Sequence, residues 1–475
     1  MEHKKTGTAL AALLAAGACA AYSYGRMQKR RREVQSIPKG AKIVILGAGF
    51  AGIHVARELM RLIPPEKNAD IVLVDQNDFL LFTPMLTETA GGSVDAQHIV
   101  ARIRNMAPGV RFQQGRVTSV DLETKRVTIE VGGEDGIPAA MRDLEADHLV
   151  IALGSCSNFR GTPGVQEHAL TVKTVGDAAA IRGRIEALLE RATDEPDEEI
   201  RRALLTIVVA GGGYSGVETM AAVNDLLRDS MRDYPTLKPA QARTILMDLG
   251  DRLLPELGEK LASYAQRELE HRGVAVRLKT GITGAGDGYV EIKGGERIAS
   301  HTLIWAAGVK PSPIVEALDI TQGRHGGIIV DGSCAAQGRP GVWALGDCAE
   351  IPHPDGKGTY APTAQNAMRE GTLTARNIVA ALRGEPTKPF VYTPMGEMAL
   401  VGRYTGVARV FGLQFSGPLA WAMWRCVYLA KMPGLGKRAR ILADWTLDAI
   451  FGREGADSIA TRGARKLEAP GAYED

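Results

Sequence analysis

The sequence predicts an α/β protein built from two similar parallel-sheet domains. Two apolar stretches, around Ile45 and Val208, each run into a glycine-rich turn, "GAGFAG" and "GGGYSG". A stretch typical of a helix follows each turn, and a second apolar stretch after it ends in an aspartate. Strand, glycine turn, helix and strand in this order are typical of a doubly wound sheet, so their repetition predicts a duplicated fold.

Composition places the chain among folded proteins. Of its 475 residues, 45% are apolar and 24% are charged, which is the balance of a globular protein with a sizeable core. A net charge of +2 argues against an extended nucleic-acid surface, because such a surface needs a strong basic excess. The 5 cysteines are scattered without paired spacing, so neither a disulfide framework nor a metal site is predicted, and a reducing compartment fits best.

The two copies repeat the same elements in the same order. In the first, a strand from Lys42 leads into the glycine turn, and the next strand, "ADIVLVD", ends at Asp75. "GRVTSVDLETKRVTIEV" then alternates as a β-hairpin does, and "DHLVIALGS" is an apolar strand that ends at Gly154. In the second copy the matching features are Asp248, a hairpin around "DGYVEIKGGERI" and a strand that ends at Gly308.

Each glycine turn has the spacing of a phosphate-binding loop. The first glycine permits a tight turn, the second lets the backbone approach a pyrophosphate, and the third lets helix and strand pack closely. Backbone N–H groups and the helix dipole then face the phosphates, while the aspartate accepts hydrogen bonds from a ribose. These features together predict two Rossmann-like dinucleotide-binding domains, with two merely glycine-rich turns as the alternative. The glycines are Gly47, Gly49 and Gly52 in the first copy and Gly211, Gly213 and Gly216 in the second.

The aspartate of the second copy predicts which nicotinamide nucleotide binds. Two sites allow a flavin in one and a nicotinamide nucleotide in the other. A carboxylate at Asp248 binds the 2′-hydroxyl of NADH and repels a 2′-phosphate, and the following Leu249 and Gly250 offer no basic side chain. Asp248 lies further from its glycine turn than the usual about 20 residues, and we assign the excess to a loop around "RDYPTLKPAQ". A surface charge at Asp248 is the alternative.

The N-terminal region is typical of a membrane anchor. An uncharged apolar run at residues 8–24 follows Lys4 and Lys5 and precedes a cluster of arginines. It is shorter than the about 20 residues that span a bilayer, so a signal or transit peptide and a disordered tail remain alternatives. The heavier positive charge on its C-terminal side predicts that the rest of the chain lies on the cytoplasmic side.

Several further segments resemble those of one family, the type II NADH dehydrogenases, which pass electrons from NADH to a membrane quinone without pumping protons. The resemblance covers roughly residues 42–453. Its segments as they stand here are "GAGFAG", "FLLFTPMLTETAGG", "ALGSCSNFRGTPGV", "GGGYSGVE", "LIWAAGVKPSP", "GVWALGDCAEI", "APTAQNAMREG" and "GPLAWAMWRCVYLAKMPGLGKRARILADWTLDAIF". It implies a glutathione reductase-like arrangement of two dinucleotide-binding domains, with FAD and NADH as cofactors and hydride transfer from nicotinamide to flavin.

The resemblance also implies roles for single residues in cofactor binding. Thr83 and Pro84 are expected near the flavin ring, and Asp347 is expected to accept a hydrogen bond from the ribityl chain. For Asp347, capping of a following helix is the alternative. Gly308 is expected to close the pocket beside the nicotinamide. The residues implied for FAD are Gly47, Gly49, Gly52, Asp75, Thr83, Pro84, Gly154 and Asp347, and those for NADH are Gly211, Gly213, Gly216, Asp248 and Gly308.

Three residues are implied in catalysis. Glu218, in "GGGYSGVE", is expected near nicotinamide and flavin, where it orients the nicotinamide or relays a proton; an acid stabilised by the helix dipole is the alternative. "APTAQNAMREG" matches the quinone-side segment at Gln365, but Arg369 stands where a second glutamine is usual. Four residues apart, the two share a helix face, and a guanidinium still donates to a quinone carbonyl. A plain surface arginine is the alternative.

The C-terminal region is predicted to associate with a membrane. Trp421, Trp424 and Trp445 occur there with Tyr428 and several basic residues, and aromatic rings beside basic side chains are typical of an interfacial helix. The stretch 418–432 is too short and too interrupted by charge to span a bilayer. An ordinary core or dimer-interface helix is the alternative.

These observations lead to an expected function and domain order. We expect an FAD-dependent NADH:quinone oxidoreductase on the cytoplasmic side of a cell membrane, with a homodimer possible. A sulfide:quinone reductase-like flavoprotein, which needs reactive cysteines such as Cys156 or Cys348, and a membrane-anchored, NADH-sensing flavoprotein with a binding role are the alternatives. The expected regions are an anchor and linker at 1–40, an FAD-binding domain at 41–175 and 321–392, an NADH-binding domain at 176–320 and a membrane-associating region at 393–475.

Overall fold

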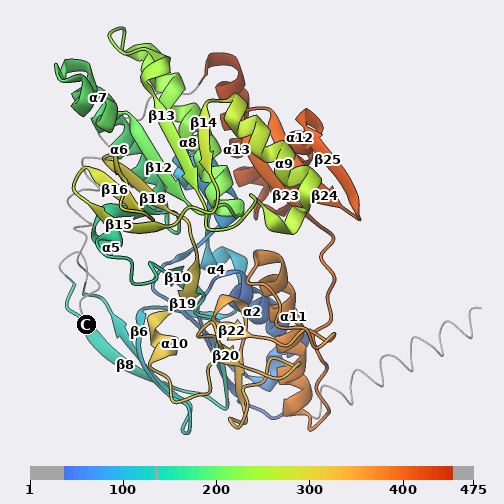
Figure 1. Cartoon of the computed structure of the whole chain (residues 1–475). Helices are drawn as coiled ribbons and strands as arrows, with labels where there is room; N and C mark the ends of the chain where they lie inside the picture. Colours follow the sequence, from blue (N-terminus) through green and yellow to red (C-terminus); the bar gives the residue numbers. More distant parts are fainter. Residues whose placement is uncertain (1–36, 134–136, 453–475) are drawn as a thin grey trace, which may run out of the picture. The chain divides into compact units, whose positions relative to one another are not determined.

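The computed structural model describes residues 37–133 and 137–452, so the predicted N-terminal anchor lies outside the described residues. The chain forms two compact α/β units, as predicted, and each is discontinuous in sequence (Figure 1). Unit 1 contains Ile103–Gly154, Pro311–Tyr392 and the described residues up to Asp78. Unit 2 contains Phe79–Arg102, Ser155–Lys310 and the described residues from Thr393. These units differ from the expected domain bounds at 79–102 and 155–175, which belong to unit 2, and at 311–320, which belong to unit 1.

Unit 1 is built on a five-stranded parallel sheet in the order β21-β9-β1-β2-β5. The strands are β1 (Lys42–Leu46), β2 (Asp70–Asp75), β5 (Arg111–Gln114), β9 (His148–Ile151) and β21 (Val342–Ala344). After its first residue the central strand β1 is buried throughout, which is the pattern of a parallel strand covered on both faces.

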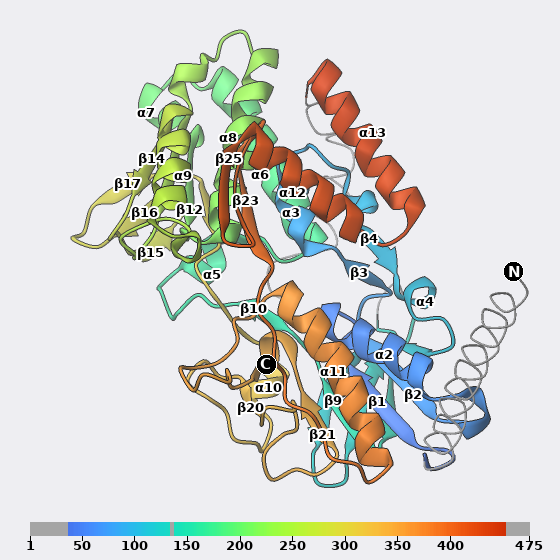
Figure 2. The ribbon, with the colours of Figure 1, turned by 90° about the vertical axis from the view of Figure 1, so that its right-hand side faces the viewer.

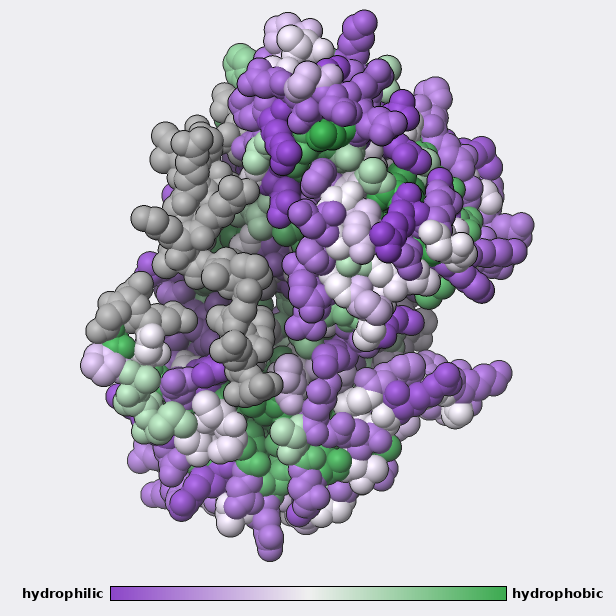
Figure 3. All heavy atoms as spheres, turned by 60° about the vertical axis from the view of Figure 1, so that its left-hand side comes forward, coloured by the Kyte–Doolittle hydropathy of each residue, from purple (hydrophilic) through white to green (hydrophobic). Residues whose placement is uncertain are grey.

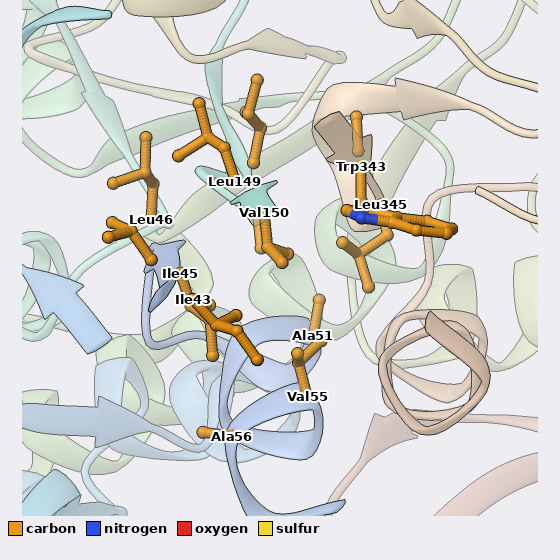
Figure 4. Close-up of a cluster of buried hydrophobic side chains, with 14 of the residues drawn as sticks. Ile43, Ile45, Leu46, Ala51, Val55, Ala56, Leu149, Val150, Trp343 and Leu345 are labelled. Carbon is orange, nitrogen blue, oxygen red and sulfur yellow. The ribbon is translucent and has the colours of Figure 1, made fainter. Parts of the chain in front are cut away.

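The core of unit 1 includes the sheet and helix α2 (Phe50–Leu62), which follows the glycine turn. Figure 4 shows Ile43 of β1, Val150 of β9 and Val55 of α2 in one cluster of buried side chains. Helix α11 (Ala364–Leu382) packs beside α2 (Figure 2). Gly371 permits this close approach, because a Cβ there would overlap the backbone of Ala51.

The remaining strands of unit 1 include the predicted hairpin. β6 (Arg116–Asp121) and β7 (Arg126–Val131) pair in antiparallel fashion, and β8 (Ala140–Glu145) extends them. The other elements of the unit are η1 (Pro65–Lys67), α4 (Ile103–Met106), α10 (Pro313–Glu316), β20 (Ile328–Ile329), the 3₁₀ turn η7 (Gly346–Cys348) and β22 (Ala349–Glu350).

Unit 2 repeats this architecture with a parallel sheet in the order β11-β18-β12-β13-β14. The strands are β11 (Ala169–Thr171), β12 (Thr206–Ala210), β13 (Arg243–Met247), β14 (Val274–Arg277) and β18 (Thr302–Trp305). In both sheets the strand before the glycine turn is third in the order, and the strand that leads to the aspartate lies next to it. The predicted duplication is therefore confirmed.

The elements that follow the second glycine turn explain why Asp248 lies unusually far from that turn in sequence. Helix α8 (Tyr214–Ser230) follows the second glycine turn, and the 3₁₀ turns η4 (Met231–Asp233) and η5 (Pro239–Gln241) fill the connection to β13. The loop predicted around "RDYPTLKPAQ" is thus confirmed. The predicted hairpin is also present, as β16 (Tyr289–Ile292) and β17 (Arg297–Ala299) with β15 (Ile282–Gly286). The other elements are β10 (Ser155–Ser157), α5 (Val165–His168), α6 (Val175–Asp194), α7 (Glu198–Leu204), η6 (Pro255–Leu257), α9 (Glu259–His271) and β19 (Val309–Pro311).

Two further segments complete unit 2. Residues 79–102 form β3 (Phe79–Leu81), η2 (Thr83–Met85), α3 (Leu86–Ala90), η3 (Ala96–His98) and β4 (Val100–Arg102), and α3 packs on α6 and α8. The C-terminal segment forms the antiparallel sheet β23 (Gly396–Gly402), β24 (Thr405–Val410) and β25 (Leu413–Gly417), then α12 (Pro418–Lys431) and α13 (Leu435–Phe451). Across the described ranges no helix is long and apolar enough to cross a membrane.

Candidate functional site

The glycine turn of unit 1 joins β1 to α2. Gly47 has φ +94°, and a Cβ on Gly47 or on Gly52 would overlap nearby backbone carbonyl oxygens. A Cβ on Gly49 would meet nothing within 4 Å, so the middle glycine borders open space. Gly49 is the N-cap of α2, and no side chain among the described residues caps this helix. The turn therefore offers N–H groups and room for a phosphate.

The glycine turn of unit 2 repeats this geometry. Gly211 has φ +116°, and a Cβ on Gly211 or on Gly216 would again overlap backbone carbonyl oxygens. Gly213 borders open space and is the N-cap of α8, whose N–H groups likewise lack a side-chain cap in the described part of the chain. In both turns the first and third glycines lie against neighbouring backbone, whereas the middle glycine borders open space. Both turns therefore fit the pyrophosphate of a dinucleotide.

The two aspartates bind the turns that precede them. Asp75, the last residue of β2, accepts a hydrogen bond from the Ala48 N–H at 2.7 Å. Asp248, directly after β13, accepts hydrogen bonds from the N–H groups of Gly212 and Gly250, each at 2.6 Å. Asp248 is therefore part of the loop structure and not an isolated surface charge. Both carboxylates lie at the edge of the sheet where a ribose would bind.

The last strand of each copy also leads to a glycine with positive φ. Gly154 has φ +67° and borders open space, whereas a Cβ on Gly308, with φ +124°, would lie 3.3 Å from the guanidinium of Arg160. Arg160 lines a surface hollow of about 340 Å³ together with residues 157–164 and Lys310. Arg160 lies within the segment "ALGSCSNFRGTPGV", but no role was predicted for it from the sequence.

Asp347 lies in the 3₁₀ turn η7 of unit 1, and it does not cap a helix. Strand β22 follows η7, and the cap of α11 is Thr363, whose Oγ1 accepts a hydrogen bond from Asn366 N–H. The helix-cap alternative for Asp347 is therefore wrong. Next to it, Gly346 N–H donates to the buried carboxyl of Glu370 at 2.9 Å, and burial raises the pKa of Glu370 to about 7. Sequence reasoning missed Glu370, although it directly follows Arg369.

Glu218 lies early in α8 with its carboxyl group enclosed, although part of the residue remains exposed. Its Oε1 accepts hydrogen bonds from Leu400 N–H of β23 at 2.9 Å and from Trp424 Nε1 of α12 at 3.0 Å. Burial, with a smaller contribution from the negative charge of Glu88, raises the pKa of Glu218 to about 8, although the two hydrogen bonds oppose this shift. Glu218 therefore has specific partners on β23 and α12 in addition to its place near the start of α8.

Glu88 is a second buried carboxylate of unit 2, on α3. Its Oε1 accepts a hydrogen bond from Arg425 Nη2 and its Oε2 from Trp445 Nε1, each at 3.2 Å. The guanidinium of Arg425 lies over the rings of Trp421 and Trp445, at 4.3 and 4.5 Å from their centroids. Thr83 and Pro84, expected near the flavin, form η2 directly before α3. The C-terminal helices thus supply one indole N–H to each of the two acidic groups.

The prediction that the C-terminal aromatic rings face a membrane is wrong for two tryptophans. Trp424 is 1% exposed and Trp445 is 5% exposed, because both indole N–H groups point inward to carboxylates. Both belong to the inner face of the helix pair, as the core-helix alternative expected. The large apolar side chains on the outer face of these helices are Leu419, Leu435, Leu442, Leu447, Ile450 and Phe451.

Gln365 and Arg369 share a face of α11, as predicted. Arg369 Nη1 donates to the backbone carbonyl of Gln365 at 3.0 Å, and its guanidinium carbon lies 4.0 Å from the ring centroid of Tyr392. The Tyr392 hydroxyl donates to Gln365 Oε1 at 3.1 Å. Arg369 is half-buried and contacts two partners, the Gln365 carbonyl and the Tyr392 ring. Tyr392 was missed because it lies at the end of an irregular segment after α11, and no motif in that segment indicates that it turns back to Gln365.

The cysteines considered for sulfide chemistry have different environments. Cys348 is buried in unit 1, and burial raises the pKa of its thiol to about 11. A reactive cysteine needs a lowered pKa and access to solvent, so Cys348 is unsuited to such chemistry. Cys156 is half-buried in unit 2.

Comparison with known proteins identifies the class. Residues 41–371 match the family described as pyridine nucleotide-disulphide oxidoreductase, and residues 395–454 match the NDH2 C-terminal domain. The duplicated nucleotide folds and the C-terminal segment described above correspond to these two matches.

Individual relatives narrow the class to one family. The chain is 31% identical to the type II NADH:quinone oxidoreductase NdhA of Mycobacterium tuberculosis, over 89% of this chain and 90% of that protein. It is also 31% identical to the demethylphylloquinone reductase NdbB of Synechocystis, over 85% of this chain and 97% of that protein. The chain belongs to the type II NADH:quinone oxidoreductase family.

Solved structures agree on the fold. The structure of NDH2 from Plasmodium falciparum in complex with NADH matches with a TM-score of 0.80 at 20% identity, over 88% of this chain and 100% of that chain. The sulfide:quinone oxidoreductase of Aquifex aeolicus matches with a TM-score of 0.65 at 16% identity. The architecture is therefore shared by enzymes with different electron donors.

Proposed function

We propose that the protein is an FAD-dependent NADH:quinone oxidoreductase. The observation that carries this proposal is the pair of glycine turns, each with an open middle glycine and an aspartate bound to the loop. FAD, when bound, accepts a hydride from NADH and passes the electrons to a quinone. Two glycine turns suit this reaction, because one can bind FAD and the other NADH. Oxidation of sulfide does not require a second nucleotide-binding turn.

Each nucleotide has its own set of residues. The glycine turn and Asp75 of unit 1 hold the ADP half of FAD, and Gly154 and Asp347 of the same unit adjoin its flavin half. The glycine turn of unit 2 holds the pyrophosphate of NADH, Asp248 binds the adenosine ribose, and Gly308 adjoins the nicotinamide. Asp248 excludes a 2′-phosphate because its carboxylate would repel it.

The acceptor side uses different groups. Gln365 and Arg369 donate hydrogen bonds to the carbonyl oxygens of the quinone, and the charge of Arg369 stabilises negative charge that develops there. Glu218 holds a proton at neutral pH, because its pKa is raised to about 8, and supplies or receives it during turnover.

The helix pair α12 and α13 is the membrane-facing surface. Its outer face carries exposed leucines and Phe451, with the exposed basic residues Lys431 and Arg440 beside them. An apolar face flanked by basic side chains suits binding to a lipid surface without spanning it. The arginines that follow the N-terminal apolar run favour the cytoplasmic side.

The test separates the two half-reactions of the FAD-loaded protein. Anaerobic titration with NADH should bleach the bound flavin, and a short-chain quinone should restore its colour rapidly. Bleaching followed by slow reoxidation with every quinone tried would overturn quinone reduction and favour the binding role. Bleaching by sulfide but not by NADH would favour the sulfide reductase alternative.

A further inference from the structure

Tyr392 contacts both residues of the proposed acceptor side. Its hydroxyl reaches the side-chain oxygen of Gln365, and its ring lies under the guanidinium of Arg369. Arg369 in turn donates to the backbone carbonyl of Gln365, so the three residues form one connected group in unit 1.

The position of Tyr392 is fixed independently of these contacts. The backbone N–H of Tyr392 donates to the hydroxyl of Tyr360 at 3.2 Å. Asn377 of α11 holds the preceding segment, because its amide nitrogen donates to Lys388 O at 2.9 Å and its oxygen accepts from Lys388 N–H at 2.9 Å. Tyr392 is thus a support for Gln365 and Arg369 and does not depend on them for its place.

The hydrogen bond from Tyr392 decides which polar atoms the group presents. The hydroxyl donates to Oε1 of Gln365, so the other end of the same amide is its NH₂ group, which only donates. A guanidinium also only donates. The group therefore offers donors, which suit the carbonyl oxygens of an oxidised quinone and the negative charge that these oxygens acquire on reduction.

We propose that Tyr392 is a positioning residue of the quinone site, which orients the Gln365 amide through its hydroxyl and the Arg369 guanidinium through its ring. This inference rests on the proposed quinone reductase function. Arg369 stands where the family usually has a second glutamine. Its side chain is long, flexible and charged, so the ring of Tyr392 is needed to fix the orientation of the guanidinium.

The experiment uses the full-length, FAD-loaded protein and compares two electron acceptors. A short-chain quinone needs hydrogen bonds to its carbonyl oxygens, whereas ferricyanide accepts electrons without them. Tyr392→Phe, which removes only the hydroxyl, should raise KM for the quinone about 3- to 10-fold and leave kcat, NADH bleaching and ferricyanide reduction unchanged. Tyr392→Leu, which also removes the ring, should lower kcat with quinone as well.

Two controls and one equilibrium measurement make the test specific. Tyr289 of β16 also carries an arginine over its ring, Arg297 at 4.4 Å, so Tyr289→Phe is a matched control that should change nothing. In a Gln365→Ala background, Tyr392→Phe should have no further effect on KM, because the orienting contact is already lost. Quinone binding to the oxidised protein without NADH, followed by the flavin absorbance, should weaken in Tyr392→Phe by the same factor as KM rises.

The outcomes separate this inference from the proposed function. Unchanged quinone kinetics in both Tyr392 variants would overturn the positioning role, and so would equal losses with quinone and ferricyanide. A wild-type protein that reduces ferricyanide but no quinone would instead overturn the proposed function.

Discussion

Both hydrogen bonds to Glu218 end on the same carboxyl oxygen, Oε1, and come from a backbone N–H and an indole N–H. The other oxygen can therefore carry the proton of the neutral acid while both bonds are kept. Because burial raises the pKa to about 8, the neutral form predominates at pH 7. This protonation state is the one that the proposed function requires of Glu218.

Glu218 should make folding stability depend on pH. Its folded-state pKa lies above the usual value of 4.5, so its stabilising effect is complete below about pH 4.5 and is lost as the pH rises to about 8. Over this window the group lowers the free energy of unfolding by up to about 1.4 kcal/mol per pH unit. In Glu218→Gln, whose amide oxygen accepts the same two bonds, this loss should disappear.

Urea unfolding of both proteins at pH 5 and pH 8 checks this prediction. The free energy of unfolding of Glu218→Gln, relative to that of the wild type, should be higher at pH 8 than at pH 5. Glu259→Gln, at an exposed position at the start of α9, is the control and should show no such trend. A difference between Glu218→Gln and the wild type that is the same at both pH values would contradict the assignment.

Asp248 should determine the choice between NADH and NADPH. Asp248→Asn keeps one side-chain oxygen for the Gly212 N–H but loses the oxygen that accepts from the Gly250 N–H, and it removes the charge that repels a 2′-phosphate. We expect the preference for NADH in kcat/KM to fall on the order of tenfold, mainly through KM for NADH. Asp75→Asn, the matching change in unit 1, should leave this preference unchanged. A wild-type preference for NADPH would show that Asp248 has another role.

At the scale of elements, α12 and α13 are docked to α3 by a buried ion pair. Glu88 is 4% exposed, and Arg425 lies between two indole rings while it donates to Glu88. Removal of one partner leaves a buried charge without compensation, which costs more than the pair itself contributes. The docking of the C-terminal helices therefore depends on this pair.

Arg425→Met should lower the free energy of unfolding by about 2–4 kcal/mol, because Glu88 then keeps a charge that has lost its partner. Glu88→Gln in the same protein should recover part of the loss. Arg440→Met, at an exposed position of α13, is the control and should change stability by less than about 0.5 kcal/mol. Chemical unfolding of the four proteins measures these differences, and equal effects of Arg425→Met and Arg440→Met would rule out a buried pair.

The same helices limit what a truncation experiment can show. Removal of α12 would take away the indole that donates to Glu218, and removal of α13 would take away the one that donates to Glu88. A truncated protein is therefore expected to be altered near Glu218 as well as at its surface. Point substitutions on the outer face are the better probe of membrane binding.

At the scale of the whole molecule, exposed apolar side chains occur on several elements, but α13 carries a group of them. On the face shown in Figure 3 hydrophilic side chains predominate. Leu442, Leu447 and Ile450 of α13 are between 54% and 66% exposed, whereas Ile441 and Trp445 of the same helix are buried. A helix with one buried and one exposed apolar face suggests that the second face binds something other than water.

The triple variant Leu442→Gln, Leu447→Gln and Ile450→Gln should bind less to vesicles that contain anionic lipid. Each exposed leucine that enters the lipid contributes apolar burial, so the loss of three should lower the bound fraction several-fold. NADH bleaching should be unchanged, because the nucleotide turns are elsewhere in the sequence. Met141→Gln with Ile200→Gln, two exposed apolar positions on β8 and α7, is the control. Vesicle flotation of the wild type, the triple variant and the control variant measures this effect. Equal flotation of all three would exclude α13 as the membrane-binding face.

Much of the nucleotide-binding architecture was predictable from sequence alone. The glycine turns, the aspartates, both hairpins and the duplicated strand order all appear as predicted. These features are local, because the tight turn between strand and helix needs positive φ and close backbone approach at fixed positions, which glycine allows and other residues do not. The shared face of Gln365 and Arg369 follows for the same reason from the period of a helix.

Contacts between distant segments were decided only by the tertiary structure. Trp424 and Trp445 occur in a segment whose composition is typical of an interfacial helix, yet their indole N–H groups donate to carboxyl groups on α8 and α3. The neutral state of Glu218 and the support of Arg369 by Tyr392 likewise need partners that are remote in the chain. The local sequence determines where the helices, strands and turns of this protein form. The charge state and orientation of a side chain depend instead on its burial and its partners, and only the complete fold supplies these.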